Sequence, residues 1–64
     1  MIRDVHFIYN RDNLVGWCQS KQDADAICET NASFVHNSKR ATTSVLATLV
    51  FVEPAEGRVR YWRA

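Results

Sequence analysis

The residues in this chain best suited to chemistry are cations and aromatic rings that lie close together near its end. Arg58 and Arg60 occupy alternate positions, and Tyr61, Trp62 and Arg63 follow them. A guanidinium group donates paired hydrogen bonds and stacks on flat surfaces, while an aromatic ring offers a large contact area with few rotatable bonds. Both residue types are enriched at the energetic centres of protein interfaces. The segment therefore indicates binding rather than catalysis.

The turn before these residues determines which of them share a face. Pro54 fixes φ at the first corner of a turn, and Gly57 supplies the positive φ needed to leave it. This pattern predicts a hairpin whose four-residue loop runs from Pro54 to Gly57. In the register that this loop sets, Phe51 faces Arg60, and Arg58 lies on the same side. One face of the hairpin then mixes apolar and cationic side chains.

The mixed face of this hairpin is the candidate binding site. The opposite face, with Val52, Val59 and Tyr61, is a plain core face. Because one helix covers only one side of a small sheet, we expect the mixed face to be open to water or to a partner. An alternative is an edge strand that its arginines keep soluble, with Trp62 covering an end of the core. The residues expected to bind a partner are Phe51, Arg58, Arg60, Trp62 and Arg63.

A second group of cations, Lys39 and Arg40, precedes hydroxyl side chains in a polar stretch. Adjacent cations beside hydroxyl groups can bind an oxyanion or form the recognition sequence of a kinase. Residues 37–44 have no apolar periodicity, and we expect an exposed basic loop there. Lys39 and Arg40 are therefore a candidate anion-contacting site, and an ordinary solvated loop is the alternative.

Residues for catalysis or metal binding are sparse. His6, His36, Cys18 and Cys28 lie apart in the sequence, and no spacing groups them with a general base or a second pair of metal ligands. We expect Cys28 to be an ordinary core thiol. With no glycine-rich phosphate loop either, we expect no catalytic residue, no metal site, no cofactor and no small-molecule substrate.

The order of apolar and polar residues predicts the elements that carry these side chains. Val5, Phe7 and Tyr9 alternate with polar residues as in a strand with one buried face. Apolar residues at helical spacing begin after Ser20, which suits a helix N-cap, and Gly16 indicates a bulge or a close backbone approach. The expected strands are 3–9, 14–19, 45–53 and 58–63, with a helix at 21–36.

These elements define an α+β fold. We expect a single ββαββ domain over residues 1–64, in which one helix joins two β-hairpins and covers one face of a four-stranded sheet. A chain of 64 residues is near the lower limit at which a hydrophobic core alone sustains folding. A partner, or a second copy of the chain, would relieve this marginal stability.

Charge and hydropathy limit the classes of partner. The formal net charge is +1, with the cations concentrated toward the C-terminus. The chain has neither a signal-peptide pattern nor an apolar run long enough to cross a bilayer, so we expect a cytoplasmic protein that does not act at a membrane.

The function that these patterns favour is a small, non-catalytic protein-binding or regulatory module, with another protein or a second copy as its partner. The alternative is weak binding of single-stranded nucleic acid, in which aromatic rings stack on bases and arginines contact phosphates. The small net charge counts against this alternative.

Overall fold

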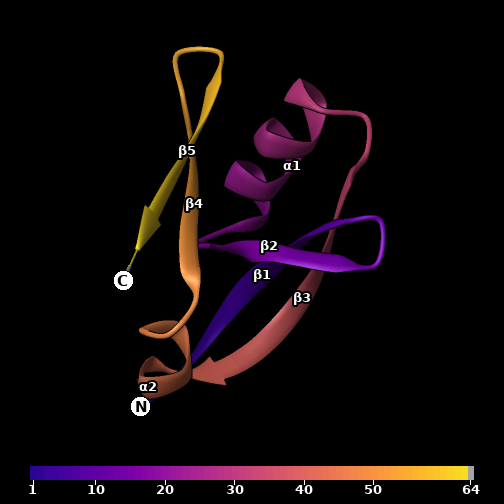
Figure 1. Cartoon of the computed structure of the whole chain (residues 1–64). Coiled ribbons are helices and arrows are strands. Elements are labelled where there is room, and N and C mark those ends of the chain that lie inside the picture. The colour runs from indigo at the N-terminus through magenta and orange to yellow at the C-terminus, as the bar shows by residue number, and fades with distance from the viewer. Residues whose placement is uncertain (64) are drawn as a thin grey trace.

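Strands and short helices make up the computed structural model of the chain, which describes residues 1–63 (Figure 1). The strands are β1 (Ile2–Asn10), β2 (Asn13–Cys18), β3 (Phe34–Thr42), β4 (Val50–Ala55) and β5 (Arg58–Arg63), and the helices are α1 (Lys21–Thr30) and α2 (Thr43–Leu46). The five strands form one mixed sheet in the order β3-β1-β2-β4-β5. The α+β class is therefore confirmed, and the expected four-stranded ββαββ order matches only in part, because an additional strand and a short helix lie between α1 and the second hairpin.

The first hairpin follows from a polar turn. Asn10 pairs with Asn13, and the turn residue Arg11 adopts φ 59°, the left-handed conformation that a two-residue hairpin loop requires. Strands β1 and β2 lie within one residue of the expected ranges at each end.

Gly16 is needed where β2 meets β4. The register of β1 with β2 shifts beside Gly16, and a Cβ atom built on this glycine would lie 2.4 Å from the carbonyl oxygen of Val50 and 2.7 Å from Cγ2 of Val52. The only bridge between β2 and β4 in the described residues is a parallel one from Trp17 to Phe51. Gly16 therefore marks both the bulge and the close backbone approach that the sequence indicates.

Helix α1 ends at Thr30 and not at His36. Its start is as expected, since the Ser20 hydroxyl accepts a hydrogen bond from the backbone N–H of Asp23. At the other end, the Asn31 side chain accepts a hydrogen bond from the backbone N–H of Ser33, and Asn31 itself is extended. An asparagine that bonds its own backbone competes with helix propagation, and the chain turns into β3.

Residues 37–44 are not a loop. Strand β3 extends from Phe34 to Thr42 and pairs with β1 at nine positions, from Ile2 to Asn10. An edge strand has one solvated face and one free edge, so most of its side chains can be polar, and its apolar periodicity is correspondingly weak. This is why the stretch resembles a loop in the sequence.

The apolar run expected as one strand over residues 45–53 is divided. Val45 and Leu46 belong to α2, which Thr42 caps by accepting a hydrogen bond from the backbone N–H of Val45. Strand β4 then begins at Val50. A short apolar run is equally consistent with a buried strand and with a buried helical turn, and residues 45–53 contain both.

The β4–β5 hairpin has a loop of two residues and not four. Glu56 and Gly57 have φ 51° and 76°, as in the primed turns that suit strand twist. Pro54 lies inside β4 opposite Val59. The residues that flank a two-residue loop form a hydrogen-bonded pair, so the next pair points its N–H groups outward, and the missing N–H of Pro54 removes no bond to β5.

The core consists of two hydrophobic clusters on opposite faces of the sheet. Helix α1 covers one of them and α2 the other. The indole N–H of Trp17, in the second cluster, donates a 3.2 Å hydrogen bond to the carbonyl oxygen of Leu46 at the end of α2. The buried residues under α1 are Ile8, Cys18, Ala24, Ile27, Phe34 and Val52, and those of the second cluster are Val5, Trp17 and Leu46.

Candidate functional site

The residues expected to bind a partner lie mostly on one face of the β4–β5 hairpin. In the observed register, Phe51 pairs with Trp62, and Arg60 and Arg58 follow at alternate positions of β5. Alternate residues of a strand project to the same face, so these side chains share a face, which is opposite to that of α1. Arg63 ends β5 opposite Val50, and its side chain lies outside the described part of the chain.

This face is less open than expected, because α2 and the turn after it cover one end. Phe51 is partly buried in the second cluster, where its ring lies 4.8 Å from that of Trp17. Leu46 and Leu49 pack in the same cluster. Phe51 therefore packs beneath the site and is not an exposed contact residue. The exposed part of the face lies on β5.

Trp62 is the exposed aromatic residue of the site. Its side chain is 47% exposed, and its indole N–H donates a 3.0 Å hydrogen bond to Oε1 of Glu53. Glu53 also lies directly opposite Arg60 in the register. The nearest cross-strand carboxylate is thus bonded to the tryptophan, and no salt bridge to Arg60 is formed among residues 1–63.

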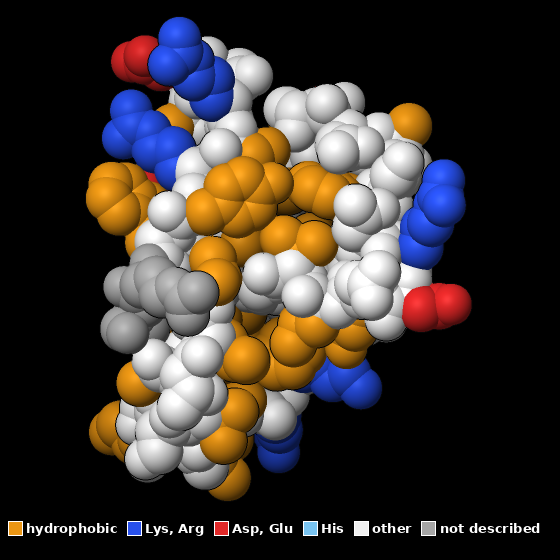
Figure 2. Space-filling model, in the orientation of Figure 1, with side chains coloured by type: hydrophobic (Ala, Val, Ile, Leu, Met, Phe, Trp, Pro, Cys, Tyr) orange, Lys and Arg blue, Asp and Glu red, His pale blue; other side chains and the backbone are white. Residues whose placement is uncertain are grey.

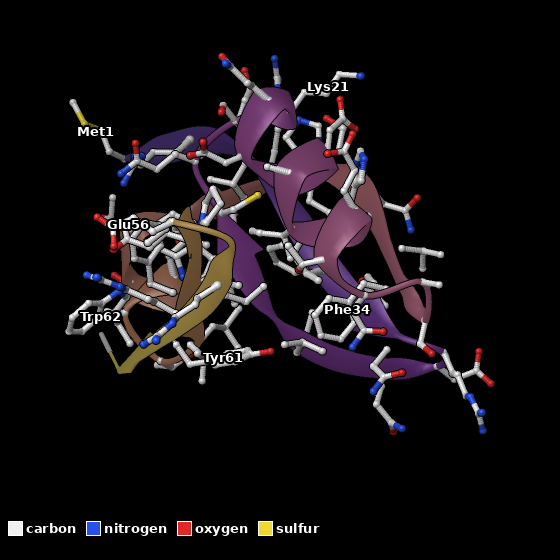
Figure 3. All side chains as sticks on the ribbon, turned by 90° about the horizontal axis from the view of Figure 1, so that it is seen from above. Met1, Lys21, Phe34, Glu56, Tyr61 and Trp62 are labelled. Atoms are coloured by element: carbon white, nitrogen blue, oxygen red, sulfur yellow. The ribbon has the colours of Figure 1, made fainter. Side chains whose placement is uncertain are left out.

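Tyr61 is not the core residue that the sequence indicates. It lies on the α1 side of β5 opposite Val52, yet it is 54% exposed, because β5 is the last strand of the sheet and it is Val59, not Tyr61, that packs against the cluster under α1. Figure 3 shows Tyr61 and Trp62 pointing in different directions from β5, with Tyr61 toward the side where Phe34 lies. The strand therefore presents an aromatic side chain on each of its two faces.

The surface around β5 combines apolar and basic groups. Figure 2 shows hydrophobic side chains in a band beside the β4–β5 hairpin, and Lys or Arg side chains gathered near the tip of that hairpin with an acidic one beside them. No pocket forms in the described structure. A surface of this kind suits an extended or flat partner better than a small molecule.

The structure does not bring Lys39 and Arg40 together. They are neighbours in β3, opposite Val5 and Asp4 of β1, so they project to opposite faces of the sheet. Nε of Arg40 donates a 3.0 Å hydrogen bond to Oδ1 of Asp4. The pair therefore does not converge on a common anion.

A cluster that sequence reasoning missed lies where α1 crosses β1 and β3. Nε2 of His36 lies 2.9 Å from Oδ1 of Asp25, and Lys21 donates a 2.8 Å hydrogen bond to Oδ2 of the same carboxylate. These two hydrogen bonds, from Lys21 and then His36, hold the pKa of Asp25 below its ordinary value. The ring of His6 meets that of His36 edge to face at 5.3 Å. The sequence contains no local signal for this cluster, because residues 34–36 fit a helical stripe and the pairing of β3 with β1 joins residues that are distant in the chain.

The cysteines are poorly suited to nucleophilic chemistry. Cys18 is fully buried, and burial raises the pKa of its thiol to about 11. Its Sγ lies 3.4 Å from the carbonyl oxygen of Ser20. Burial also raises the pKa of Cys28 on α1. In the part of the chain that the structure describes, no group of three or more His, Cys, Asp or Glu side chains is arranged to hold a metal ion.

Comparisons with known proteins do not identify a function, so the function has to be inferred from the sequence and the structure. The sequence matches no family model and no curated protein, and no solved structure matches it. None of the helices in residues 1–63 is long and apolar enough to cross a membrane.

Proposed function

We propose that this chain is a small, non-catalytic protein-binding or regulatory module of the cytoplasm that acts through the exposed face of β5. The observation that carries this proposal is the combination of Arg58, Arg60 and Trp62 on one face of an edge strand, with no ion pair to either arginine among the described residues. Arginine and tryptophan are the residues most often found at the energetic centres of protein interfaces.

The packing beneath these residues supports a binding role. Phe51 and Trp17 form a fixed base for the face, so the exposed side chains project from packed strands rather than from a loop. A site on a rigid element loses less conformational entropy when a partner binds. Glu53 orients the indole of Trp62 through the 3.0 Å hydrogen bond.

Binding of single-stranded nucleic acid is the weaker candidate. The Glu53 carboxylate lies next to Trp62 and opposite Arg60, where it would repel a phosphate backbone. The net charge of +1 adds little general attraction.

The proposed function is tested by affinity capture from nuclease-treated lysate with the whole chain as bait. We compare the wild type with a folded Arg60→Glu/Trp62→Ala variant, and use Lys39→Glu on β3 as a control for reversed charge. A protein that wild type and Lys39→Glu capture, that the double variant does not, and that binds the purified wild type directly supports the proposal. Equal capture by all three baits, or a partner that is captured only when the nuclease is omitted, contradicts it.

A further inference from the structure

The backbone of β5 has one edge whose N–H and C=O groups have no partner strand among the described residues. Strand β5 is last in the sheet and pairs only with β4 among the described residues, and its register with β4 has no irregularity. Ala55 and Arg58 flank the two-residue loop and form a hydrogen-bonded pair, so the bonding alternates from there. The N–H and C=O groups of Val59 and Tyr61 therefore face away from β4, toward the open edge.

The cationic residues Arg58 and Arg60 alternate along β5 with the residues that carry these free backbone groups. Arg58 and Arg60 are exposed, and the ion pairs of the described residues all lie elsewhere, in Lys21–Asp25, His36–Asp25 and Arg40–Asp4. Glu53, the carboxylate opposite Arg60, accepts the hydrogen bond of Trp62. An incoming strand would thus meet two guanidinium groups that the fold has left without a carboxylate.

A second copy of the chain does not provide the complementary charge. If two β5 strands paired, Arg58 and Arg60 of each would lie near those of the other, and like charges across a strand pair are destabilising. The other edge strand of the sheet, β3, contains no Asp or Glu, so it does not offer β5 a complementary charge either. Charge therefore favours a different protein as the partner.

We propose that β5 binds an extended acidic segment of another protein, which adds to the sheet as a sixth strand. This inference rests on the proposed function and specifies its partner. Acidic side chains at alternate positions of the segment pair with Arg58 and Arg60, and apolar side chains between them contact the exposed ring of Tyr61 on the other face. Main-chain hydrogen bonds to Val59 and Tyr61 supply affinity, and the arginines select for acidic sequences.

The test uses a short peptide with blocked termini in which Glu and Val alternate, titrated into the isotope-labelled whole chain and followed by amide NMR at low salt. The expected result is saturable binding, with slower amide hydrogen exchange at Val59 and Tyr61. Binding should weaken at least about tenfold when Gln replaces Glu in the peptide, or in an Arg58→Gln/Arg60→Gln variant, because charge-assisted hydrogen bonds are lost. Lys39→Gln should bind like the wild type.

A fully N-methylated form of the same peptide separates edge pairing from binding to the face. It retains the side chains and loses every backbone donor, so it should not bind. If it binds as well as the parent peptide, the sixth-strand proposal is wrong, while the proposed binding function of the face stands. If the parent peptide does not bind, or if Val59 and Tyr61 are already protected by self-association, the acidic-strand proposal fails, and the capture experiment alone decides the proposed function.

Discussion

The two edge strands of the sheet carry similar charges and use them differently. In β3, Arg40 pairs with Asp4 of β1, and His36 lies against Asp25 of α1. In β5, Arg58 and Arg60 have no such partner among residues 1–63. Both edges protect the sheet against uncontrolled pairing, because charged side chains discourage it. Only the edge whose charges the fold leaves uncompensated has charge available for a partner.

The largest expected effect is at the junction that holds the two ends of the sheet together. Gly16→Val should destabilise the fold by about 4 kcal/mol or more, because its Cβ would overlap the backbone of β4 at Val50. Gly57→Asn is the matched control, since nothing lies within 4 Å of its Cβ position and asparagine tolerates positive φ. Urea unfolding followed by circular dichroism measures both. A Gly16→Val protein with the wild-type midpoint would show that the two ends are not joined there.

Truncation of a buried residue should have the next largest effect. Ile27 of α1 is fully buried in the cluster beneath the helix, and Ile27→Ala should lower the free energy of unfolding by about 2 to 5 kcal/mol. Tyr61→Ala, at the open edge, should lower it by less than about 1 kcal/mol, because Tyr61 is 54% exposed and lies outside the buried cluster. Equal losses in urea unfolding would mean that β5 is covered in solution, and the contrast between the edges would disappear.

Burial of Cys18 in the centre of the sheet should make the fold less stable at alkaline pH. Burial raises the pKa of Cys18 from 9.0 to about 11, so the folded state binds the thiol proton more tightly than the unfolded state does. The resulting stabilisation is complete below about pH 9 and is lost between about pH 9 and 11, by at most about 2 to 3 kcal/mol. Unfolding midpoints measured across this range should fall more steeply for the wild type than for Cys18→Ala. Parallel slopes would show that the thiol is not buried.

The smallest effect compares the two edges directly. Arg40→Gln should reduce stability by about 0.2 to 1 kcal/mol at low salt, because it removes an exposed ion pair with Asp4. Arg60→Gln should leave stability unchanged, since no ion pair is lost in the described structure. Thermal unfolding at low salt measures the difference, and added salt should abolish it. A larger loss for Arg60→Gln would place a missing partner at β5.

The parts of the fold that could be predicted from the sequence depend on local signals. The turn at Arg11 and the cap at Ser20 each follow from residues a few positions apart. A glycine inside a strand pattern is also a local signal, and it indicates the close approach at Gly16 without indicating that Val50 is the residue approached. Strand β3 depends on pairing with distant β1, and its side chains are mostly exposed, so neither periodicity nor propensity identifies it. The end of α1 is not predictable from local pattern either, since Phe34 fits a helical stripe as well as a strand.

The sequence predicts which residues share the face of the candidate site, but it does not predict which element covers part of that face. The true hairpin register differs from the expected one by two residues, and a shift of two keeps every side chain on its face. Arg58, Arg60 and Trp62 therefore share a face, as the sequence predicts. Phe51 is covered by α2, and the sequence predicts the apolar residues of this helix, Val45 and Leu46, as part of a strand.

The two tryptophans make folding and binding separately visible by fluorescence. Trp17 of β2 is buried against α2, and its indole N–H donates a hydrogen bond to a backbone carbonyl of that helix. Trp62 of β5 is about half exposed. Emission from a buried indole shifts on unfolding, while emission from Trp62 responds to whatever covers the outer strand. A Trp17→Phe chain would emit from the candidate site alone, and a Trp62→Phe chain from the core alone, so each fluorophore reports on one end of the molecule without an added label.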